Sequence, residues 1–121
     1  MFKSLAATLV LATAASVVGA GVQPSAPRKI TVEAERFSFF PSRIKVRVGE
    51  AIELHLRSAD TSHGFTVEGT DIDVEIPKRG QGEVVVEYTP TREGRFRFEC
   101  DRMCGAGHHF MRGEIVVLAK E

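Results

Sequence analysis

From Lys29 onward, apolar and polar residues alternate with a period of two. The alternation is clearest in residues 29–35 (KITVEAE), 43–48 (RIKVRV) and 51–57 (AIELHLR). Because successive side chains of a strand point to opposite faces, this period predicts β-strands with one buried face. The same reading, with Gly and Pro residues at the breaks, predicts further strands at residues 65–67, 72–76, 83–88, 95–100 and 113–118.

Seven or eight short strands in about a hundred residues predict an all-β domain, a Greek-key β-sandwich. No window of the sequence has the pattern of an amphipathic helix. The inward positions of the predicted strands define a core of Val32, Ile44, Val46, Val48, Ile52, Leu54, Leu56, Val84, Val86, Phe96, Phe98, Ile115 and Val117. Phe39 and Phe40, beside Pro41, are interpreted as closing one end of the sandwich.

Length and charge limit what such a domain can do. The chain has 121 residues, which allows one domain of ordinary size. Its 16 Lys and Arg residues balance 16 Asp and Glu residues, so nothing in the net charge favours nucleic acid as a partner. The charge therefore predicts no nucleic-acid binding.

The N-terminus has the features of an export signal. Lys3 precedes an apolar run, and Val18, Gly19 and Ala20 form a small-residue cleavage pattern. We predict a signal peptide at residues 1–20, a linker at 21–28 and the folded domain at 29–121. The alternative is an uncleaved membrane anchor at residues 5–22, the only contact with a membrane that we expect. Either reading predicts a periplasmic or other extracytoplasmic location.

Candidate chemistry is concentrated in residues 100–111, which contain two Cys, two His and two Met residues. Soft sulfur and imidazole ligands of this kind suit Cu(I), zinc and iron–sulfur centres. Cys100 follows Phe96 and Phe98 at intervals of two, so its thiol is predicted to point inward at the end of a strand. The chain must then turn for Cys104 to approach it, which predicts a ligand loop between two strands.

A further strong ligand has to come from elsewhere in the chain, and the candidates are His55 and His63. His55 lies between Leu54 and Leu56 in the alternation, which places it on the solvent face. His63 lies beside Gly64 at the start of a strand, where a loop can direct a side chain into the end of the sandwich. His109 is predicted to be exposed near the site.

Three interpretations of the two thiols remain open at this point. A disulfide would suit an exported protein, although the loop between Cys100 and Cys104 is so short that it would add little stability. A zinc site of two Cys and two His residues is a second possibility. A copper site is favoured over both, because a thioether at Met111 is an unusual zinc ligand.

These residues resemble the copper A domain of cytochrome c oxidase subunit II, in the cupredoxin superfamily. The resemblance rests on the ligand spacing and on the segments SHGFTVEGTDIDVEIP, EYTPTREGRFRFEC and CGAGHHFMRGEIVV, and it extends from Ile30 to Ala119. It implies a cupredoxin-like sandwich with a dinuclear copper centre of two ions. The implied metal ligands are His63, Cys100, Arg102, Cys104, His108 and Met111.

In this resemblance the thiolates of Cys100 and Cys104 bridge the two ions, and the two histidines each bind one. Met111 and the backbone carbonyl of Arg102 are weak ligands; the family usually has Glu at the latter position. The chain differs from the family in two further respects: it has no Trp residue, and its one candidate membrane segment is the apolar run at residues 5–22.

The implied function is electron transfer rather than catalysis, since protein atoms would fill every strong ligand position. The implied partner is a redox protein, either a c-type cytochrome or a terminal oxidase. Two other functions fit the same residues. One is a periplasmic copper chaperone or store. The other is a mononuclear blue or red copper carrier that uses His63, Cys104, His108 and Met111.

Overall fold

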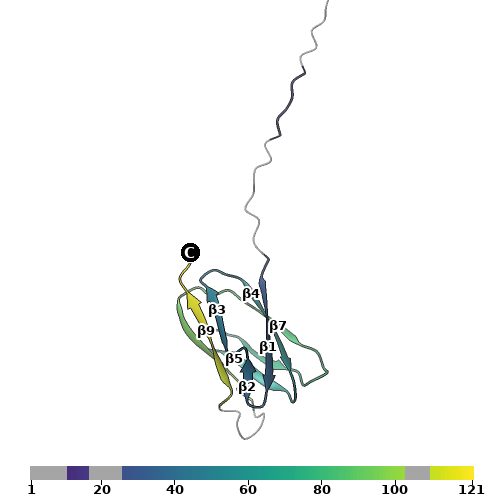
Figure 1. Cartoon of the computed structure of the whole chain (residues 1–121), viewed down its shortest axis with the longest axis vertical. Helices are drawn as coiled ribbons and strands as arrows, with labels where there is room; N and C mark the ends of the chain where they lie inside the picture. The colour runs from purple at the N-terminus through teal and green to yellow at the C-terminus, as the bar shows by residue number, and fades with distance from the viewer. Residues whose placement is uncertain (1–10, 17–25, 103–109) are drawn as a thin grey trace, which may run out of the picture.

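The computed structural model describes residues 11–16, 26–102 and 110–121. Figure 1 shows that the strands, which lie between Arg28 and Leu118, build two layers. The strands are β1 (Arg28–Glu35), β2 (Ser38–Phe40), β3 (Arg43–Arg47), β4 (Ile52–Ser58), β5 (His63–Val67), β6 (Asp73–Ile76), β7 (Val84–Tyr88), β8 (Gly94–Glu99) and β9 (Arg112–Leu118). The predicted all-β class is confirmed, and all eight predicted strands are present to within a few residues.

The strands form one four-stranded and one five-stranded sheet. The first has the order β2-β1-β4-β7 and the second the order β3-β9-β8-β5-β6. β1 pairs parallel to β4 and β3 pairs parallel to β9, whereas the other pairs are antiparallel. Within the part of the chain that the structure describes, no helix is long and apolar enough to cross a membrane.

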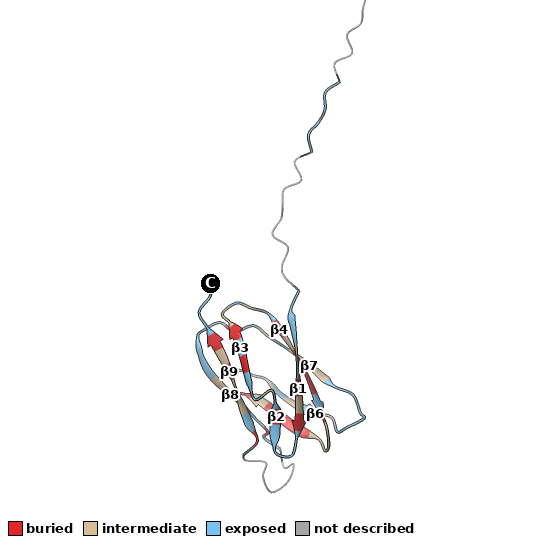
Figure 2. Ribbon diagram, viewed as in Figure 1, coloured by how far each residue is buried: buried red, intermediate tan, exposed pale blue. Residues whose placement is uncertain are grey.

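The core lies between the two sheets (Figure 2). Nine of the thirteen predicted core residues are buried. The other four, Val48, Val84, Val86 and Phe96, are partly buried and pack against the core. Val84 and Val86 lie on β7, an edge strand covered on one side only, and Phe96 is covered by the guanidinium of Arg92 at 5.2 Å from its ring centroid.

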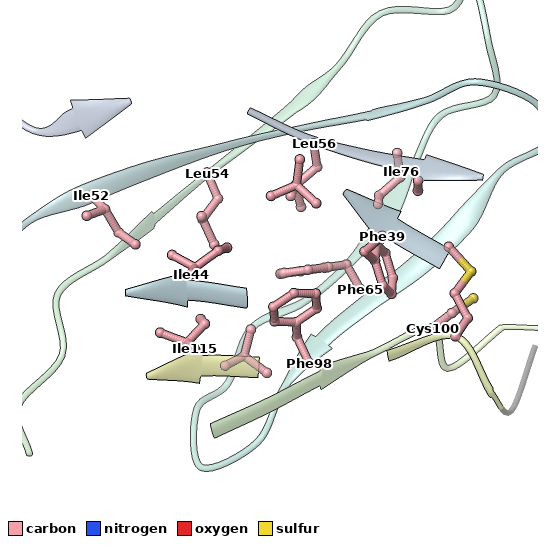
Figure 3. Packing of buried hydrophobic residues seen from close by; sticks show 14 of the residues in the cluster. Phe39, Ile44, Ile52, Leu54, Leu56, Phe65, Ile76, Phe98, Cys100 and Ile115 are labelled. Atoms are coloured by element: carbon pink, nitrogen blue, oxygen red, sulfur yellow. The ribbon is translucent and has the colours of Figure 1, made fainter. Parts of the chain in front are cut away.

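The one strand that alternation did not predict is β2, which has three residues and so too few to display a period. It places Phe39 opposite Ala34 of β1. The ring of Phe39 is buried and meets Phe65 and Phe98 edge-to-face, at centroid distances of 5.7 and 5.3 Å (Figure 3). Phe39 therefore closes the core as predicted, whereas Phe40 is 79% exposed and does not.

Candidate metal centre

Three strand ends meet at one end of the five-stranded sheet. β5 begins at His63, β8 ends one residue before Cys100, and β9 begins one residue after Met111. Because β8 pairs antiparallel with both β5 and β9, these strand ends lie at the same end of the sheet. The backbone N–H of Cys100 donates to the carbonyl of Met111 at 3.0 Å. In Figure 3, Cys100 lies at the end of the core away from Ile52 and Ile115.

His63 is buried and held from one side. Its side chain is 0% exposed, and its Nε2 lies 2.7 Å from Oδ1 of Asp60. Its other ring nitrogen, Nδ1, is buried with no hydrogen-bond partner among the described residues. An imidazole with one nitrogen held by a carboxylate presents the other to a metal ion in many metalloproteins. A buried polar atom without a partner is otherwise costly.

Asp60 is arranged to remain ionised beside His63. Burial, the largest single influence, would raise its pKa, but hydrogen bonds from the Arg36 N–H, the His63 ring and the Thr61 N–H together lower the pKa below its ordinary value of 3.8. An ionised carboxylate accepts a hydrogen bond from Nε2–H, and in that tautomer the lone pair of the ring lies on Nδ1. Asp60 thus selects the tautomer that a metal ligand needs.

The thiol of Cys100 is adjacent to the His63 segment. Its Sγ accepts a hydrogen bond from the backbone N–H of Gly64 at 3.4 Å and donates to the carbonyl of Arg102 at 3.3 Å. A side chain at Gly64 would collide with the side chains of Asp101 and Arg102. Glycine therefore allows the two segments to approach this closely without a shift of the Asp101 and Arg102 side chains.

The side chain of Arg102 lies over the edge strand β6. Its guanidinium is 3.9 Å from carboxylate oxygens of both Asp73 and Glu75. Burial, followed by the hydrogen bond and the charge of Asp73, raises the pKa of Asp101. The backbone carbonyl of Arg102 thus faces the Cys100 thiol, while its guanidinium group lies near the carboxylates of Asp73 and Glu75 on β6.

The structure brings four of the six predicted site residues to one end of the five-stranded sheet: His63, Cys100, the Arg102 carbonyl and Met111, which is fully buried. Cys104 and His108 lie outside the described residues, as does His109. Among the residues that are described, no group of three or more His, Cys, Asp or Glu side chains could hold a metal ion. The set of described donors, an imidazole nitrogen, a thiol and a thioether in apolar surroundings, fits a soft ion such as copper.

Sequence reasoning missed Asp60, and it gave Gly64 no role beyond its place beside His63. The signal was present in SADTSHGF, where an acidic residue precedes the histidine by three positions and a glycine follows it. The role of each residue depends on a contact with another segment, such as that of Gly64 with Asp101, and one sequence does not reveal such contacts.

The prediction that His55 faces solvent is wrong about its exposure. The side chain points away from the core but is only 11% exposed. Its Nδ1 lies 2.7 Å from Glu83 and its Nε2 lies 3.1 Å from Glu53. A side chain in the middle of a sheet is covered by its neighbours, and here two carboxylates occupy both ring nitrogens. Both ring nitrogens of His55 are therefore engaged by carboxylates.

Comparison with known proteins places these observations in a family context. The model of the family described as a cupredoxin-like domain matches residues 2–117. Cytochrome c oxidase subunit 2 of Thermus thermophilus is 42% identical over 99 residues, which cover 79% of this chain and 71% of that protein. A second, longer subunit 2 from the same species is equally similar, but the aligned part covers only 57% of its length.

Two solved structures have related folds. The periplasmic domain of subunit II of cytochrome oxidase (CoxB) of Bradyrhizobium japonicum aligns with a TM-score of 0.70 at 16% identity, over 80% of this chain and 88% of that one. The metal-binding domain of the Cu(I)-exporting P-type ATPase CopA of Streptococcus pneumoniae, determined with Cu(I), aligns with a TM-score of 0.60 at 25% identity, over 74% and 84%. The first likeness concerns the fold alone.

Proposed function

Because the chain belongs to the cupredoxin-like family and is homologous to cytochrome c oxidase subunit 2, we propose that it is an electron-transfer domain with a dinuclear copper A type centre. The homology implies copper binding. The number of ions and the identity of the ligands are our proposal. We also propose that the domain is an electron-transfer module and not an enzyme by itself.

The proposed ligands of the two ions are His63 through Nδ1, the thiolates of Cys100 and Cys104, His108, Met111 and the carbonyl of Arg102. When bound, copper would supply one-electron redox chemistry, with charge shared through the soft thiolates. The residues of the chain fix the geometry. Asp60 holds the His63 ring, the Gly64 N–H stabilises negative charge on the Cys100 sulfur, and the packed core limits their movement.

The observation that carries the proposal is Nδ1 of His63. It is a buried acceptor without a partner among the described residues, and it belongs to the residue that precedes the Gly64 donor to Cys100. A structural histidine in this place would be expected to use both nitrogens. If a metal ion is bound beside the Cys100 thiolate, His63 would bind it through Nδ1, and both ring nitrogens would then have partners.

Location and partners follow as proposals from the homology and the N-terminal sequence. We propose that residues 1–20 are an export signal, that 21–28 are a linker and that the domain of residues 29–121 works outside the cytoplasm, in the periplasm. The partner would be a redox protein, a c-type cytochrome or a terminal oxidase. Support for the location comes from the similarity of the fold to the periplasmic domain of CoxB.

Two serine variants test the dinuclear centre against a mononuclear one. If both thiolates bridge two ions, Cys100→Ser and Cys104→Ser should each lower the copper content from about two to about one per chain and change the absorption spectrum. A mononuclear site that uses Cys104 alone predicts a different result. In that case Cys100→Ser would leave the copper content and spectrum unchanged while Cys104→Ser would remove them.

The similarity to the CopA domain favours a second candidate function, the handling of copper as cargo. A chaperone or store must release its metal ion, whereas an electron-transfer centre must retain it. Transfer of copper from the loaded protein to a competing chelator separates the two. Retention over many hours supports electron transfer, and transfer within minutes supports copper handling.

A further inference from the structure

The outer face of β3, β9 and β8 carries a hollow of about 610 Å³ that plays no part in the metal site. We call it the arginine groove. Its charged lining comes from three neighbouring strands and the residue after β5: Arg43, Arg95, Arg97, Arg112, Glu68 and Glu114. Four guanidinium groups therefore share the groove with two carboxylates. The whole chain has equal numbers of cationic and anionic residues, so this excess of positive charge is local.

The two carboxylates of the groove are already engaged. Oε1 of Glu114 accepts from Nε of Arg43 at 2.9 Å and from a terminal nitrogen of Arg95 at 3.0 Å. Glu68 accepts a hydrogen bond from the backbone N–H of Arg97 rather than from its side chain. The guanidinium groups of Arg97 and Arg112 form no ion pair with any other residue that the structure describes.

The opposite sheet has the opposite sign. On β1, β4, β7 and the residue before β7, the outward side chains are dominated by carboxylates, with two cations, Lys29 and Arg57, against Glu33, Glu35, Glu53, Glu83 and Glu87. The lining of the groove and the outer face of the four-stranded sheet thus carry opposite excess charge, although β6 and the end of β8 add carboxylates (Asp73, Glu75 and Glu99) beyond the groove. Such a difference in charge orients a charged partner and accelerates its encounter with the matching face.

We propose that the arginine groove binds an acidic segment of a partner protein. Charge complementarity identifies the class of ligand, because two unpaired guanidinium groups favour carboxylates in bidentate contact. The groove adjoins a second hollow of about 400 Å³, whose lining shares Glu68 and Arg97 with it. Glu99 also lines the second hollow, so the acidic side chains of the segment would lie in the arginine groove itself. The combined length of the two hollows suits an extended chain better than a single small anion. The balanced charge of the whole chain gives no reason to expect nucleic acid as the ligand.

One lining residue of the groove, Arg112, is adjacent in the chain to the candidate metal centre. Arg112 is the first residue of β9 and directly follows Met111, and it lies opposite Glu99 of β8. A segment bound at Arg112 would therefore lie beside the end of the sheet where Cys100 and Met111 meet. That this segment belongs to the electron-transfer partner rests on the proposed function. The binding itself does not.

The test uses the full chain and an octaglutamate peptide, with affinity measured by fluorescence anisotropy at low and at physiological ionic strength. The double variant R97E/R112E should weaken binding by about tenfold or more. The matched control K29E/R57E changes the net charge by the same amount on the opposite face and should change the affinity less than about twofold. If R97E/R112E fails to fold, R97Q/R112Q replaces it. This variant removes the charge without reversing it and should weaken binding by a smaller factor.

Equal loss of affinity in the two double variants would overturn the proposal, because it would mean that net charge alone governs binding. Absence of peptide binding at low ionic strength would also overturn it. So would inorganic phosphate that displaces the peptide at comparable concentration, because the groove would then be a small-anion site. Measurements with and without copper separate this proposal from the proposed function: peptide binding should be the same in both.

Discussion

His63 and His55 are both nearly or fully buried and both contact carboxylates, yet their surroundings differ. His63 lies at the end of the sandwich, with Nε2 on Asp60 and a buried Nδ1 that has no partner among the described residues. His55 lies on the outer face of the four-stranded sheet, with one nitrogen on Glu83 and the other on Glu53. The difference shows that the second ring nitrogen, rather than burial, distinguishes a candidate ligand from a structural histidine.

The largest effect on the copper spectrum is expected from a comparison of two single variants, His63→Ala and His55→Ala. His63→Ala should abolish or strongly distort the copper spectrum, because the variant lacks the imidazole that Asp60 orients. His55→Ala should leave copper content and spectrum unchanged. Both proteins would be loaded with copper and compared by absorption. Equal spectral change in the two variants would remove the distinction between the two sites.

Asp60→Asn should have the next largest effect on metal binding. The amide keeps the size of the carboxylate but no longer presents a negative charge to Nε2 of His63, so copper affinity should fall by about 10- to 100-fold. Competition with a copper chelator measures the change. Asp71→Asn, at an exposed position in the turn between β5 and β6, is the matched control and should have no effect. An affinity unaltered in the Asp60 variant would mean that His63 needs no carboxylate to bind metal.

Gly64→Ala tests the close approach of the two site segments. The added methyl group would collide with Asp101 and Arg102, so chemical denaturation should show a loss of about 1–3 kcal/mol in unfolding free energy. The copper spectrum should shift as well, since the Gly64 N–H contacts the Cys100 sulfur. Adding Asp101→Ala should recover part of the stability. If the double variant shows no recovery, the clash lies elsewhere.

The smallest effect concerns pH and His55. Hydrogen bonds with Glu83 and then Glu53 raise the pKa of His55 above 6.5, against the opposing influences of partial burial and Lys29. Protonated His55 therefore stabilises the folded state fully below pH 6.5, and this contribution is lost as the pH rises through the raised value. The stability difference between the wild type and His55→Gln should shrink over that range in thermal melts. A difference that grows with pH would reverse the assigned sign.

The sequence predicted those features that depend on residues near one another in the chain. Alternation located the long strands and placed Cys100 inward, and the spacing of the soft ligands directed attention to His63 and Met111. The sequence could not predict features that depend on which strands become neighbours in the sheets. The cover over His55 comes partly from Glu83, 28 residues away, and the contact at Gly64 comes from Asp101. The neighbouring Pro41 indicated that Phe39 closes one end of the sandwich. The strand that holds Phe39 has only three residues, too few to show an alternation of apolar and polar residues.

The central claim is that two copper ions share the Cys100 and Cys104 thiolates, with Nδ1 of His63 as one of the terminal ligands. The most direct measurement is an electron paramagnetic resonance spectrum of the copper-loaded protein, recorded together with its copper-to-protein ratio. The account predicts about two ions per chain and hyperfine splitting from an unpaired electron shared equally between two copper nuclei. About one ion per chain, with splitting from a single nucleus, would contradict it.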